Sequence, residues 1–481
     1  MEGPLRSYLL INGQQVKAQE YTPVINPANT EEVVGYIPAA ETEDVGRAVE
    51  AAWAAFPKWS STPVRERVDR LRSAAQAIAS RIKDLALLLV RENGKLLREA
   101  ELDIRRAVES LEYVCKFAEE FETPQTHETK DGRFLVVKKP RGVTAVISPW
   151  NFPVVLTFRS LSPALVTGNT AVVKPPSTCP LALTEVIRIL SEHLPPGVVN
   201  LVTGKGSVVG KELITHPLVR MIGFTGSTET GKEVMRDAAS GIKKLALELG
   251  GNDPAILLED APLEEPYLQG MIRGIFTASG QVCFAIKRIY VHQSIYSDFL
   301  KRFSEAVDKM QVGNGLDEKA SMGAINNKPQ LDTVEGLVRE ARERGAKVEV
   351  LGKKLKPEDW GKGYFHLPTI ITGADQSFSI VRCEQFGPVI PVIPFKTLDQ
   401  AISWANDTEY GLRSSVWTRD EAKGIEVAKR IEAGITFLNN HSFLDRRVNF
   451  PGVKESGLGR ESIHVGLEAY VDHQGISIPK T

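Results

Sequence analysis

The chain has 481 residues, of which 42% are hydrophobic and 25% charged, a composition typical of folded globular proteins and not of disordered ones. Lysine and arginine number 59 against 60 aspartate and glutamate residues, so the net charge of −1 offers no field that would attract nucleic acid or an anionic membrane. The length predicts about two to four domains.

The N-terminal segment and the apolar runs bear on location. The first residues contain no basic stretch followed by a long apolar segment and a cleavage site, so they do not resemble a secretory signal. The longest apolar runs, such as 85–90, are too short to span a bilayer. We therefore expect a cytoplasmic protein with no membrane partner.

In chain order, the first predicted layer is helical. Apolar residues recur every three or four positions in 43–59, 64–94 and 104–121. In 126–142 an Asp-Gly turn separates two strand-like arms, which predicts a β-hairpin.

Two regions of alternating strands and helices follow. The predicted strands of the first region are 142–150, 169–176, 197–204 and 219–226, with helices at 180–194 and 208–216. The predicted strands of the second are 253–259, 288–292, 346–354, 387–395, 414–419 and 434–440, with helices at 296–310 and 331–345. This alternation predicts two α/β domains with parallel sheets. The tail, 467–481, ends in a strand that could pair with the hairpin of its own or a partner chain.

The four cysteines are widely spread. They show neither a CxxC pair nor a neighbouring histidine at metal-ligand spacing, so no metal site and no disulfide framework is expected. Composition alone favours a reduced, buried role for each of them. They are Cys115, Cys179, Cys283 and Cys383.

The loops after the strands of the first region carry the candidate ligand contacts, because parallel sheets bind ligands beyond the carboxyl ends of their strands. Segments 204–210 and 226–231 are rich in glycine and each opens onto a helix, a setting that favours phosphate. Neither has the GxGxxG spacing, so each could equally be an ordinary turn. Lys174, at a strand end, could reach a ligand or only solvent. Glu248, in apolar surroundings, could be a general base or a turn cap.

The stretches SPWNFP, GNTAVVKP, GFTGSTETG, LELGG, GQVCFA and EQFGPV occur in this order. Together they resemble the successive signature motifs of the aldehyde dehydrogenase superfamily. The resemblance runs from INPANTEEV near the N-terminus to GVKESGLGRE near the C-terminus, and so covers nearly the whole chain.

The resemblance implies a role for each matching residue. Cys283 matches the nucleophile, Glu248 the general base, and Asn151 the side-chain donor that forms an oxyanion hole with the Cys283 N–H. The implied cofactor is NAD or NADP, and the substrate is a small-molecule aldehyde oxidised to its acid through a thiohemiacetal and a thioester. The implied cofactor contacts are Trp150, Lys174, Ser177, Gly204, Gly226, Ser227, Glu384 and Phe386.

The implied fold has a variant Rossmann cofactor domain, a catalytic α/β domain and a small β oligomerisation arm. On this basis we expect the NAD(P)-binding domain to comprise 1–121 and 141–250, and the catalytic domain 251–450. The arm would comprise 122–140 and 466–481, and would build a homodimer or a homotetramer.

Several positions bear on cofactor and substrate choice. Many NAD-preferring members carry a glutamate where this chain has Ser177, so NADP should be tolerated or preferred. Arg159 stands where semialdehyde and aromatic-aldehyde members also carry arginine, although it could instead bond a neighbouring loop. The sequence departs from the family at 449–452, and the preceding loop, with His441, Asp445, Arg446 and Arg447, should border the substrate entrance.

The sequence is compared with three alternative functions. A CoA-acylating dehydrogenase would use CoA to resolve the thioester, but members of that type usually lack the glutamate found here at Glu248. A cysteine-dependent hydrolase would have no use for the two glycine-rich turns and Lys174. A non-catalytic relative is disfavoured by the intact Cys283, Glu248 and Asn151.

Overall fold

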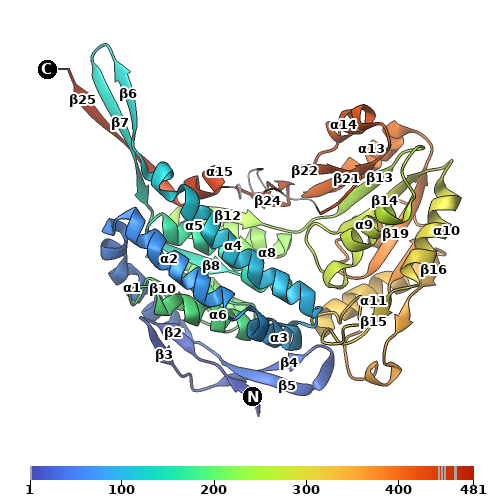
Figure 1. Cartoon of the computed structure of the whole chain (residues 1–481), viewed down its shortest axis with the longest axis horizontal. Helices are drawn as coiled ribbons and strands as arrows, with labels where there is room; N and C mark the ends of the chain where they lie inside the picture. Colours follow the sequence, from blue (N-terminus) through green and yellow to red (C-terminus); the bar gives the residue numbers. More distant parts are fainter. Residues whose placement is uncertain (1–2, 443–444, 446–447, 449–450, 460–462, 481) are drawn as a thin grey trace.

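The computed structural model of the chain describes residues 3–442, 445, 448, 451–459 and 463–480 (Figure 1). The predicted positions Arg446, Arg447 and Asn449 lie outside the described residues. Two large sheets, each covered by helices on both faces, lie side by side, and a narrow β arm projects from the first of them.

The first large sheet has a parallel centre. Its strands, in spatial order, are β24 (Gly457–Leu458), β12 (Lys244–Glu248), β11 (Val219–Thr225), β8 (Val143–Ile147), β9 (Thr170–Lys174), β10 (Val199–Leu201), β2 (Leu9–Ile11) and β3 (Gln14–Val16). The strands from β12 to β10 are parallel, whereas β24, β2 and β3 pair antiparallel at the edges. The predicted parallel sheet of the first region is confirmed.

Helices cover both faces of this sheet because successive strand side chains point to opposite faces. Val143, Ala145 and Ile147 pack against α1, α7 and α8, whereas Val146 packs within the cluster formed by α2 to α6. The helices are α1 (Thr42–Ser61), α2 (Val64–Ala79), α3 (Ile82–Asn93), α4 (Leu97–Glu122), α5 (Pro153–Val166), α6 (Leu181–Glu192), α7 (Lys211–Thr215) and α8 (Thr228–Ala238). A π-helical turn, Gly206–Gly210, leads into α7.

The predicted helical stretch 64–94 is divided into two helices. The chain leaves helical geometry at Arg81, whose φ and ψ are −111° and 8°. The side chain of Asp84 then accepts from Arg81 Nε at 3.1 Å, and α3 begins. Apolar spacing is continuous across this break, which is why the sequence alone does not reveal it.

The second large sheet is built in the same way. In spatial order its strands are β16 (Lys347–Val350), β18 (Thr369–Thr372), β19 (Val389–Phe395), β14 (Ile286–His292), β13 (Asp253–Leu257), β21 (Arg413–Trp417) and β22 (Ile435–Leu438). Only β16 pairs antiparallel among these strands. One face packs on α9 (Glu265–Phe276) and α10 (Tyr296–Val307), and the other on α11 (Lys328–Glu343), α12 (Ser379–Arg382), α13 (Leu398–Asn406) and α14 (Glu421–Ala428).

Short elements complete the two bodies. One small sheet orders β1 (Leu5–Arg6), β5 (Asn29–Pro38) and β4 (Tyr21–Asn26), and two-stranded pairs join β15 (Gln311–Val312) with β17 (Lys353–Lys354) and β20 (Tyr410–Gly411) with β23 (Val453–Lys454). Helix α15 (Ile463–Glu468) precedes the C-terminal strand.

The projecting arm is a three-stranded antiparallel sheet (Figure 1). The predicted hairpin is confirmed, since β6 (Gln125–Thr129) pairs with β7 (Gly132–Pro140) across the Asp-Gly turn. The C-terminal strand β25 (Val471–Pro479) pairs along all of β7 in the same chain. Phe134 and Ile476, on this arm, are 43% and 41% exposed.

The connectivity brings two sheet edges together. From β8 the chain proceeds to β9 and β10 on one side, then returns to β11 and β12 on the other, so the carboxyl ends of β8 and β11 form a switch point where ligands bind. Residues 249–252 lead directly from β12 in the first sheet to β13 in the second. The carboxyl edge of the first sheet therefore faces the amino edge of the second.

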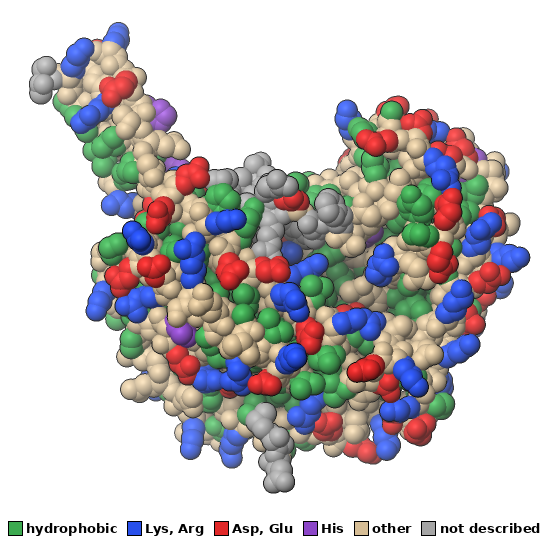
Figure 2. Space-filling view, viewed as in Figure 1, with side chains coloured by type: hydrophobic (Ala, Val, Ile, Leu, Met, Phe, Trp, Pro, Cys, Tyr) green, Lys and Arg blue, Asp and Glu red, His purple; other side chains and the backbone are tan. Residues whose placement is uncertain are grey.

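Figure 2 shows the charged side chains on one face of the molecule. Blue and red side chains are interspersed over the face shown in Figure 2, as the net charge of −1 implies. Among the residues that the structure describes, every helix is too short or too polar to cross a bilayer.

Candidate active site

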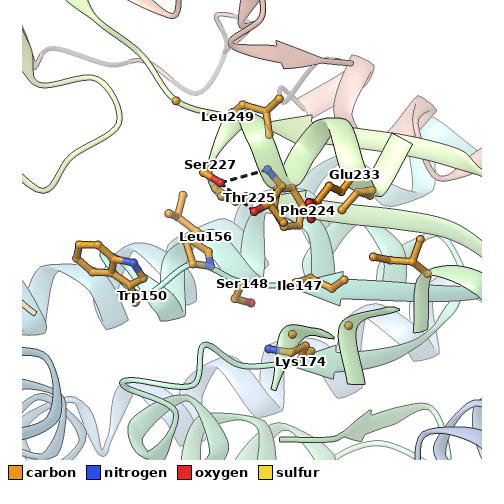
Figure 3. A pocket seen from close by; sticks show the side chains of 18 of the residues that line it. Ile147, Ser148, Trp150, Leu156, Lys174, Phe224, Thr225, Ser227, Glu233 and Leu249 are labelled. Atoms are coloured by element: carbon orange, nitrogen blue, oxygen red, sulfur yellow. Dashed lines mark hydrogen bonds between the residues drawn. The ribbon is translucent and has the colours of Figure 1, made fainter. Parts of the chain in front are cut away.

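A cavity of about 880 Å³ lies between the two facing sheet edges. Ile147 and Thr225, at the ends of β8 and β11, line it from the first sheet (Figure 3). Cys283 and Glu384 line it from loops that precede β14 and β19 of the second sheet. The predicted site residues in its lining are Trp150, Asn151, Lys174, Gly226, Ser227, Cys283, Glu384 and Phe386.

The loop between β8 and α5 carries Asn151 and is held from beneath. Lys95 Nζ donates to the carbonyl of Asn151 at 2.5 Å, and Asn93 Nδ2 donates to the carbonyl of Trp150 at 2.6 Å. The Lys95 ammonium is fully buried and forms an ion pair with Asp103 at 3.3 Å. The Asn151 backbone is therefore fixed by the segment that joins α3 to α4.

The side chain of Asn151 points toward the loop that carries Cys283. Its Nδ2 donates to the carbonyl of Gln281 at 3.0 Å, and Asn151 is only 5% exposed. An amide donor fixed at this distance from the loop is suited to stabilising an oxyanion that forms on a ligand bound to Cys283.

Residues 277–285, which we call the nucleophile loop after the role that the sequence motifs predict for Cys283, have an unusual backbone. Ala278, Ser279 and Gly280 have φ values of 49°, 59° and 74°, a left-handed run that only strong external contacts sustain. Glu99 Oε1 accepts from the Ala278 N–H at 2.8 Å, and Ser279 Oγ donates to the carbonyl of Gly323 at 3.0 Å. Because of these contacts, Cys283 is presented at the cavity wall, where it is partly exposed.

The Cys283 thiol is held in its neutral form. Burial raises its pKa to about 11, an effect that outweighs the positive charges of Lys287 and Arg159, which lower it. Since the thiolate is the nucleophilic form, a proton acceptor must act near this cysteine before it reacts.

Glu248 is the last residue of β12, and it begins the link between the sheets. It is 7% exposed, and its carbonyl accepts from the Gly226 N–H at 3.1 Å. Its negative charge acts on Cys283, whose pKa it raises, and on Arg413, whose pKa it raises against the effect of burial. Glu248, Cys283 and Arg413 thus belong to one electrostatic cluster.

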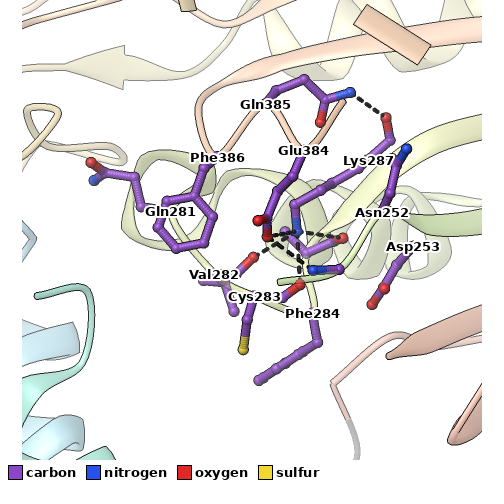
Figure 4. Close-up of polar contacts among 12 residues, drawn as sticks. Asn252, Asp253, Gln281, Val282, Cys283, Phe284, Lys287, Glu384, Gln385 and Phe386 are labelled. Atoms are coloured by element: carbon purple, nitrogen blue, oxygen red, sulfur yellow. Dashed lines mark hydrogen bonds and ion pairs between the residues drawn. The ribbon is translucent and has the colours of Figure 1, made fainter. Parts of the chain in front are cut away.

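Glu384 and Phe386 lie opposite Asn151. Glu384 Oε1 accepts from the Gly251 N–H at 3.1 Å and lies 3.7 Å from Lys287 Nζ (Figure 4). Burial raises the pKa of the Glu384 carboxyl, while Lys287 and the Gly251 N–H lower it. The Phe386 ring packs edge-on against Trp150, with ring centroids 5.2 Å apart.

The other half of the cavity has the donors that a dinucleotide requires. Lys174 ends β9 with 5% exposure, and burial lowers the pKa of its ammonium to about 8. Ser227 caps the N-terminus of α8, where its Oγ accepts from the Thr230 N–H at 3.3 Å (Figure 3). A Cβ at Gly226 would lie 2.5 Å from the ring of Phe224, so glycine is what fits against this ring. These residues fit pyrophosphate and ribose groups.

Five predicted residues lie outside this lining: Glu248, described above, and Ser177, Gly204, Arg159 and His441. Ser177 is exposed, and its Oγ donates to the carbonyl of Gly204 at 3.1 Å. Gly204 itself has a φ of +146° and packs on Val209. Arg159 is half-buried on α5, and its charge acts on Cys283.

The structure places His441 beneath the nucleophile loop. It is 1% exposed, and its Nε2 lies 2.9 Å from the carbonyl of Phe284 and 3.7 Å from Asp253 Oδ2. We expected His441 at the substrate entrance; its described contacts are with the carbonyl of Phe284, with Asp253 and with the ring of Phe437.

Sequence reasoning did not select several buried charged residues around the site. Arg413 opens β21 with no exposed surface, and its N–H donates to Asp253 Oδ1 at 3.1 Å. An arginine at the start of the short strand RSSVW was the available signal. Lys95, Glu99 and Lys287 gave none, because their partners are backbone groups of distant segments or of a loop whose shape the sequence does not reveal.

The fold and the cavity define a two-sheet α/β enzyme with a cysteine beside a dinucleotide cleft. Comparison with known proteins then identifies its family. The profile described as the Aldehyde dehydrogenase family matches residues 14–476. The chain belongs to the aldehyde dehydrogenase family.

Individual relatives are similar over their whole length. Lactaldehyde dehydrogenase of Escherichia coli (strain K12) is 37% identical over 479 residues, which cover 98% of this chain and 99% of that protein. Succinate-semialdehyde dehydrogenase (NADP+) of the same strain is 37% identical, with 97% and 96% covered. The structure of 3,6-anhydro-L-galactose dehydrogenase in complex with NAP superposes with a TM-score of 0.94 at 35% identity, covering 98% of this chain and 100% of that one.

These comparisons confirm the fold class and the resemblance expected from the sequence motifs. The protein is an oxidoreductase that converts an aldehyde to the carboxylic acid with NAD or NADP. The CoA-acylating and hydrolase alternatives are not favoured by these matches.

Proposed function

We propose that Cys283 is the nucleophile, Asn151 an oxyanion donor and Glu248 the general base of this aldehyde dehydrogenase. The observation that carries the proposal is the meeting of Cys283 and Asn151 in the wall of one cavity, with Asn151 Nδ2 bonded to the nucleophile loop at 3.0 Å. Glu248 supports it, because its charge acts on Cys283 from the link between the sheets.

Acylation begins when the Cys283 thiol gives its proton to solvent water. The thiolate adds to the aldehyde carbon, a C–S bond forms, and the carbonyl oxygen becomes an oxyanion. The Asn151 amide and the Cys283 N–H donate hydrogen bonds to this oxyanion, whose negative charge develops only when the thiolate attacks. Bound NAD(P)+ supplies the acceptor for the hydride that leaves the same carbon. Cys283 then carries a thioester.

Hydrolysis returns the enzyme to its starting state. Glu248 takes a proton from water as the water oxygen attacks the thioester carbon. The C–S bond breaks, the carboxylic acid departs, and the sulfur leaves as the Cys283 thiolate, which takes the proton from Glu248 and becomes the thiol again.

Replacement of the proposed nucleophile tests this assignment. Cys283→Ala should abolish aldehyde oxidation, while Cys383→Ala, at an exposed position outside the cavity lining, is the matched control and should leave it unchanged. Retained oxidation in Cys283→Ala would reject the assignment.

We propose that the cofactor spans the cavity from Lys174 to Glu384. Lys174 and Ser177 would lie near the adenosine ribose, the N-terminus of α8 at Ser227 near the pyrophosphate, and Glu384 with Phe386 near the nicotinamide ribose. Gly204, Gly226 and Trp150 would shape the same path.

We further propose that NADP is tolerated or preferred. Ser177 is a neutral hydroxyl where a carboxylate would repel a 2′-phosphate, and the cationic Lys211 lines the same end of the cavity. The ratio of kcat/KM for NADP+ and NAD+ tests this, and a strong preference for NAD+ would overturn it.

For the substrate, we propose an aldehyde with a polar or anionic end, such as a semialdehyde or an aromatic aldehyde. Support comes from Arg159 and the buried Arg413, whose charges act on each other and on Cys283, so that two cationic groups act at the reacting sulfur together with the carboxylates of Glu248 and Glu384. Two relatives with similar sequences act, by their names, on lactaldehyde and succinate semialdehyde.

A substrate panel with paired variants tests this substrate class. Arg159→Met should lower kcat/KM for a carboxylated aldehyde by about 10- to 100-fold, the worth of one charge-assisted hydrogen bond, and change that for an alkyl aldehyde far less. Arg105→Met, at an exposed position on α4, is the control. Equal losses for both aldehydes would reject the role of Arg159. His441, which contacts the loop backbone, should influence the same entrance only indirectly.

We also propose a cytoplasmic homo-oligomer, either a dimer or a tetramer. The projecting arm supports assembly, because a three-stranded sheet with the exposed Phe134 and Ile476 gains little from standing alone in solvent. Deletion of 466–481 should yield monomers on sizing with light scattering, and an unchanged mass would contradict this.

A further inference from the structure

Lys287, the second residue of β14, is a buried cation in direct contact with the nucleophile loop. It is 2% exposed, and its Nζ donates to the carbonyls of Val282 and Cys283, each at 2.8 Å. The same Nζ lies 3.7 Å from Glu384 Oε1 (Figure 4). The ammonium therefore joins the loop that carries Cys283 to the carboxylate proposed to hold the cofactor.

Placing an ammonium group in this buried space costs free energy. Burial of a charge carries a desolvation penalty of several kcal/mol, and an apolar side chain of similar volume often serves packing equally well. What Lys287 provides, and methionine would not, is a set of three donors and a positive charge. Two of those donors are used on consecutive carbonyls of one tight loop.

The hydrogen bond to Val282 fixes the direction of the Cys283 N–H. The carbonyl of Val282 and the N–H of Cys283 belong to one planar peptide, and no peptide bond among the described residues is cis. In a trans peptide the two groups point in opposite directions. With the carbonyl held by Lys287, the Cys283 N–H must point away from Lys287.

The neighbouring carbonyls of the loop are held in the same way. Gln281 accepts from Asn151 Nδ2 at 3.0 Å, and Phe284 contacts His441 Nε2 at 2.9 Å. Side chains thus contact four successive carbonyls, from 281 to 284, and Lys287 binds the central two. The carbonyl of Val282 also accepts from the Ala285 N–H at 3.0 Å, so loss of Lys287 would leave that turn bond but weaken the hold on the two peptide planes that adjoin the reacting sulfur.

The charge of Lys287 acts on the sulfur as well. The charged groups that act on Cys283 include Lys287 on β14, Arg159 on α5, Glu248 on β12, Glu384 before β19 and Arg413 on β21, and among them Lys287 has the largest effect. A cation in this position favours the thiolate over the thiol.

We propose that Lys287 is a positioning residue for the nucleophile: its ammonium aims the Cys283 N–H at the oxyanion and places a positive charge behind the thiolate. This inference rests on the proposed role of Cys283. It anchors the second oxyanion donor, the Cys283 N–H, from the adjoining strand β14, and it makes the chemistry of Cys283 depend on a residue that does not line the cavity.

Two substitutions separate the geometry from the charge. Lys287→Met retains the length of the side chain but removes the hydrogen-bond donors and the charge. Lys287→Gln removes the charge but retains an amide that can donate to a carbonyl. Lys301→Met, which removes an exposed charge from α10, is the control. The full-length protein is used throughout, and thermal unfolding and the binding of NADP+ are measured for every variant.

Two readouts are needed. The first is the rate at which iodoacetamide modifies Cys283 as a function of pH, followed by mass spectrometry of the peptide that contains it. The second is the single-turnover rate of NADPH formation, which reports the steps up to the thioester.

We expect both Lys287 variants to raise the pH midpoint of alkylation by about one unit, a tenfold slower reaction at a fixed lower pH. Lys287→Met should slow the single turnover by about 10- to 100-fold, within the range seen when an oxyanion donor is lost, and Lys287→Gln should slow it less. Lys301→Met should match the wild type in both readouts.

Other outcomes would overturn the proposal. An unchanged alkylation profile, with or without a slower turnover, would leave Lys287 only a structural role, and so would failure of both variants to fold. A shifted alkylation profile with an undiminished single-turnover rate would show that Lys287 does not position the Cys283 N–H. Cys283→Ala distinguishes these results from failure of the proposed function, because only in the latter case would that variant still oxidise aldehyde.

Discussion

Replacement of Lys95 by methionine should reveal how strongly the site depends on the segment beneath it. The Lys95 ammonium has no exposed surface and lies 3.3 Å from Asp103 Oδ2. At that separation, and with an effective dielectric constant of about 20, the attraction is about 5 kcal/mol. Removing one partner of a buried pair costs about 3–5 kcal/mol, because the other charge is left without compensation. We expect Lys95→Met to lose stability in this range at pH 8.

The loss should depend on pH in a defined direction. Burial already raises the pKa of Asp103, and Lys95 is the largest influence that lowers it. Without Lys95 this pKa rises further, so Asp103 binds a proton in the folded state that it does not bind when unfolded. A raised carboxyl pKa favours the folded state at low pH and disfavours it as the pH rises through that pKa. The deficit of Lys95→Met should therefore shrink from pH 8 to pH 5.

Urea unfolding followed by tryptophan fluorescence at both pH values measures this deficit. Adding Asp103→Asn to Lys95→Met removes the buried charge and should restore most of the stability at pH 8, while Lys301→Met serves as an exposed control. A deficit below about 1 kcal/mol at pH 8, or a double variant no more stable than Lys95→Met, would refute this reasoning.

Three further predictions address burial, cofactor and thiols. Burial raises the pKa of Glu92 to about 8. The free energy of unfolding of the wild type, relative to that of Glu92→Gln, should therefore fall by up to about 1.4 kcal/mol per pH unit between about pH 5 and pH 8. A difference in unfolding midpoints that does not change with pH would contradict this. Ser177→Glu should lower kcat/KM for NADP+ by at least about tenfold and that for NAD+ far less, and parallel losses would argue against a 2′-phosphate contact. Iodoacetamide should modify the exposed Cys383 quickly and the fully buried Cys179 only on unfolding, which peptide mapping can check.

Local patterns predicted most of the fold. The strands of the first sheet are short apolar runs between turn residues, and their helices repeat every three to four residues, so both signals are local. Strand β12 was missed because Lys244–Glu248 is short and includes charged ends, and its assignment depends on pairing with β11. The antiparallel pairing of β24 with β12 joins segments about 210 residues apart, beyond the reach of any local pattern.

The site was predictable only in part. The order of the motifs selected Cys283, Asn151 and Glu384, and the structure brings these residues to one cavity. The residues that hold them were not predictable, because their partners are backbone groups in other segments. Lys95, for example, binds the carbonyl of a residue 56 positions away. Such contacts exist only after the tertiary structure has formed.

The measurement that tests the central claim most directly is the detection of an acyl group on Cys283. In Glu248→Gln the thioester should form but hydrolyse slowly, since a general base contributes about 10²- to 10⁴-fold to a rate. Intact-mass and peptide analysis after mixing with aldehyde and NADP+ should then find one acyl group per chain, on the peptide that contains Cys283, together with one equivalent of NADPH. An unmodified Cys283, an acyl group on another residue, or an undiminished steady-state rate would contradict the account.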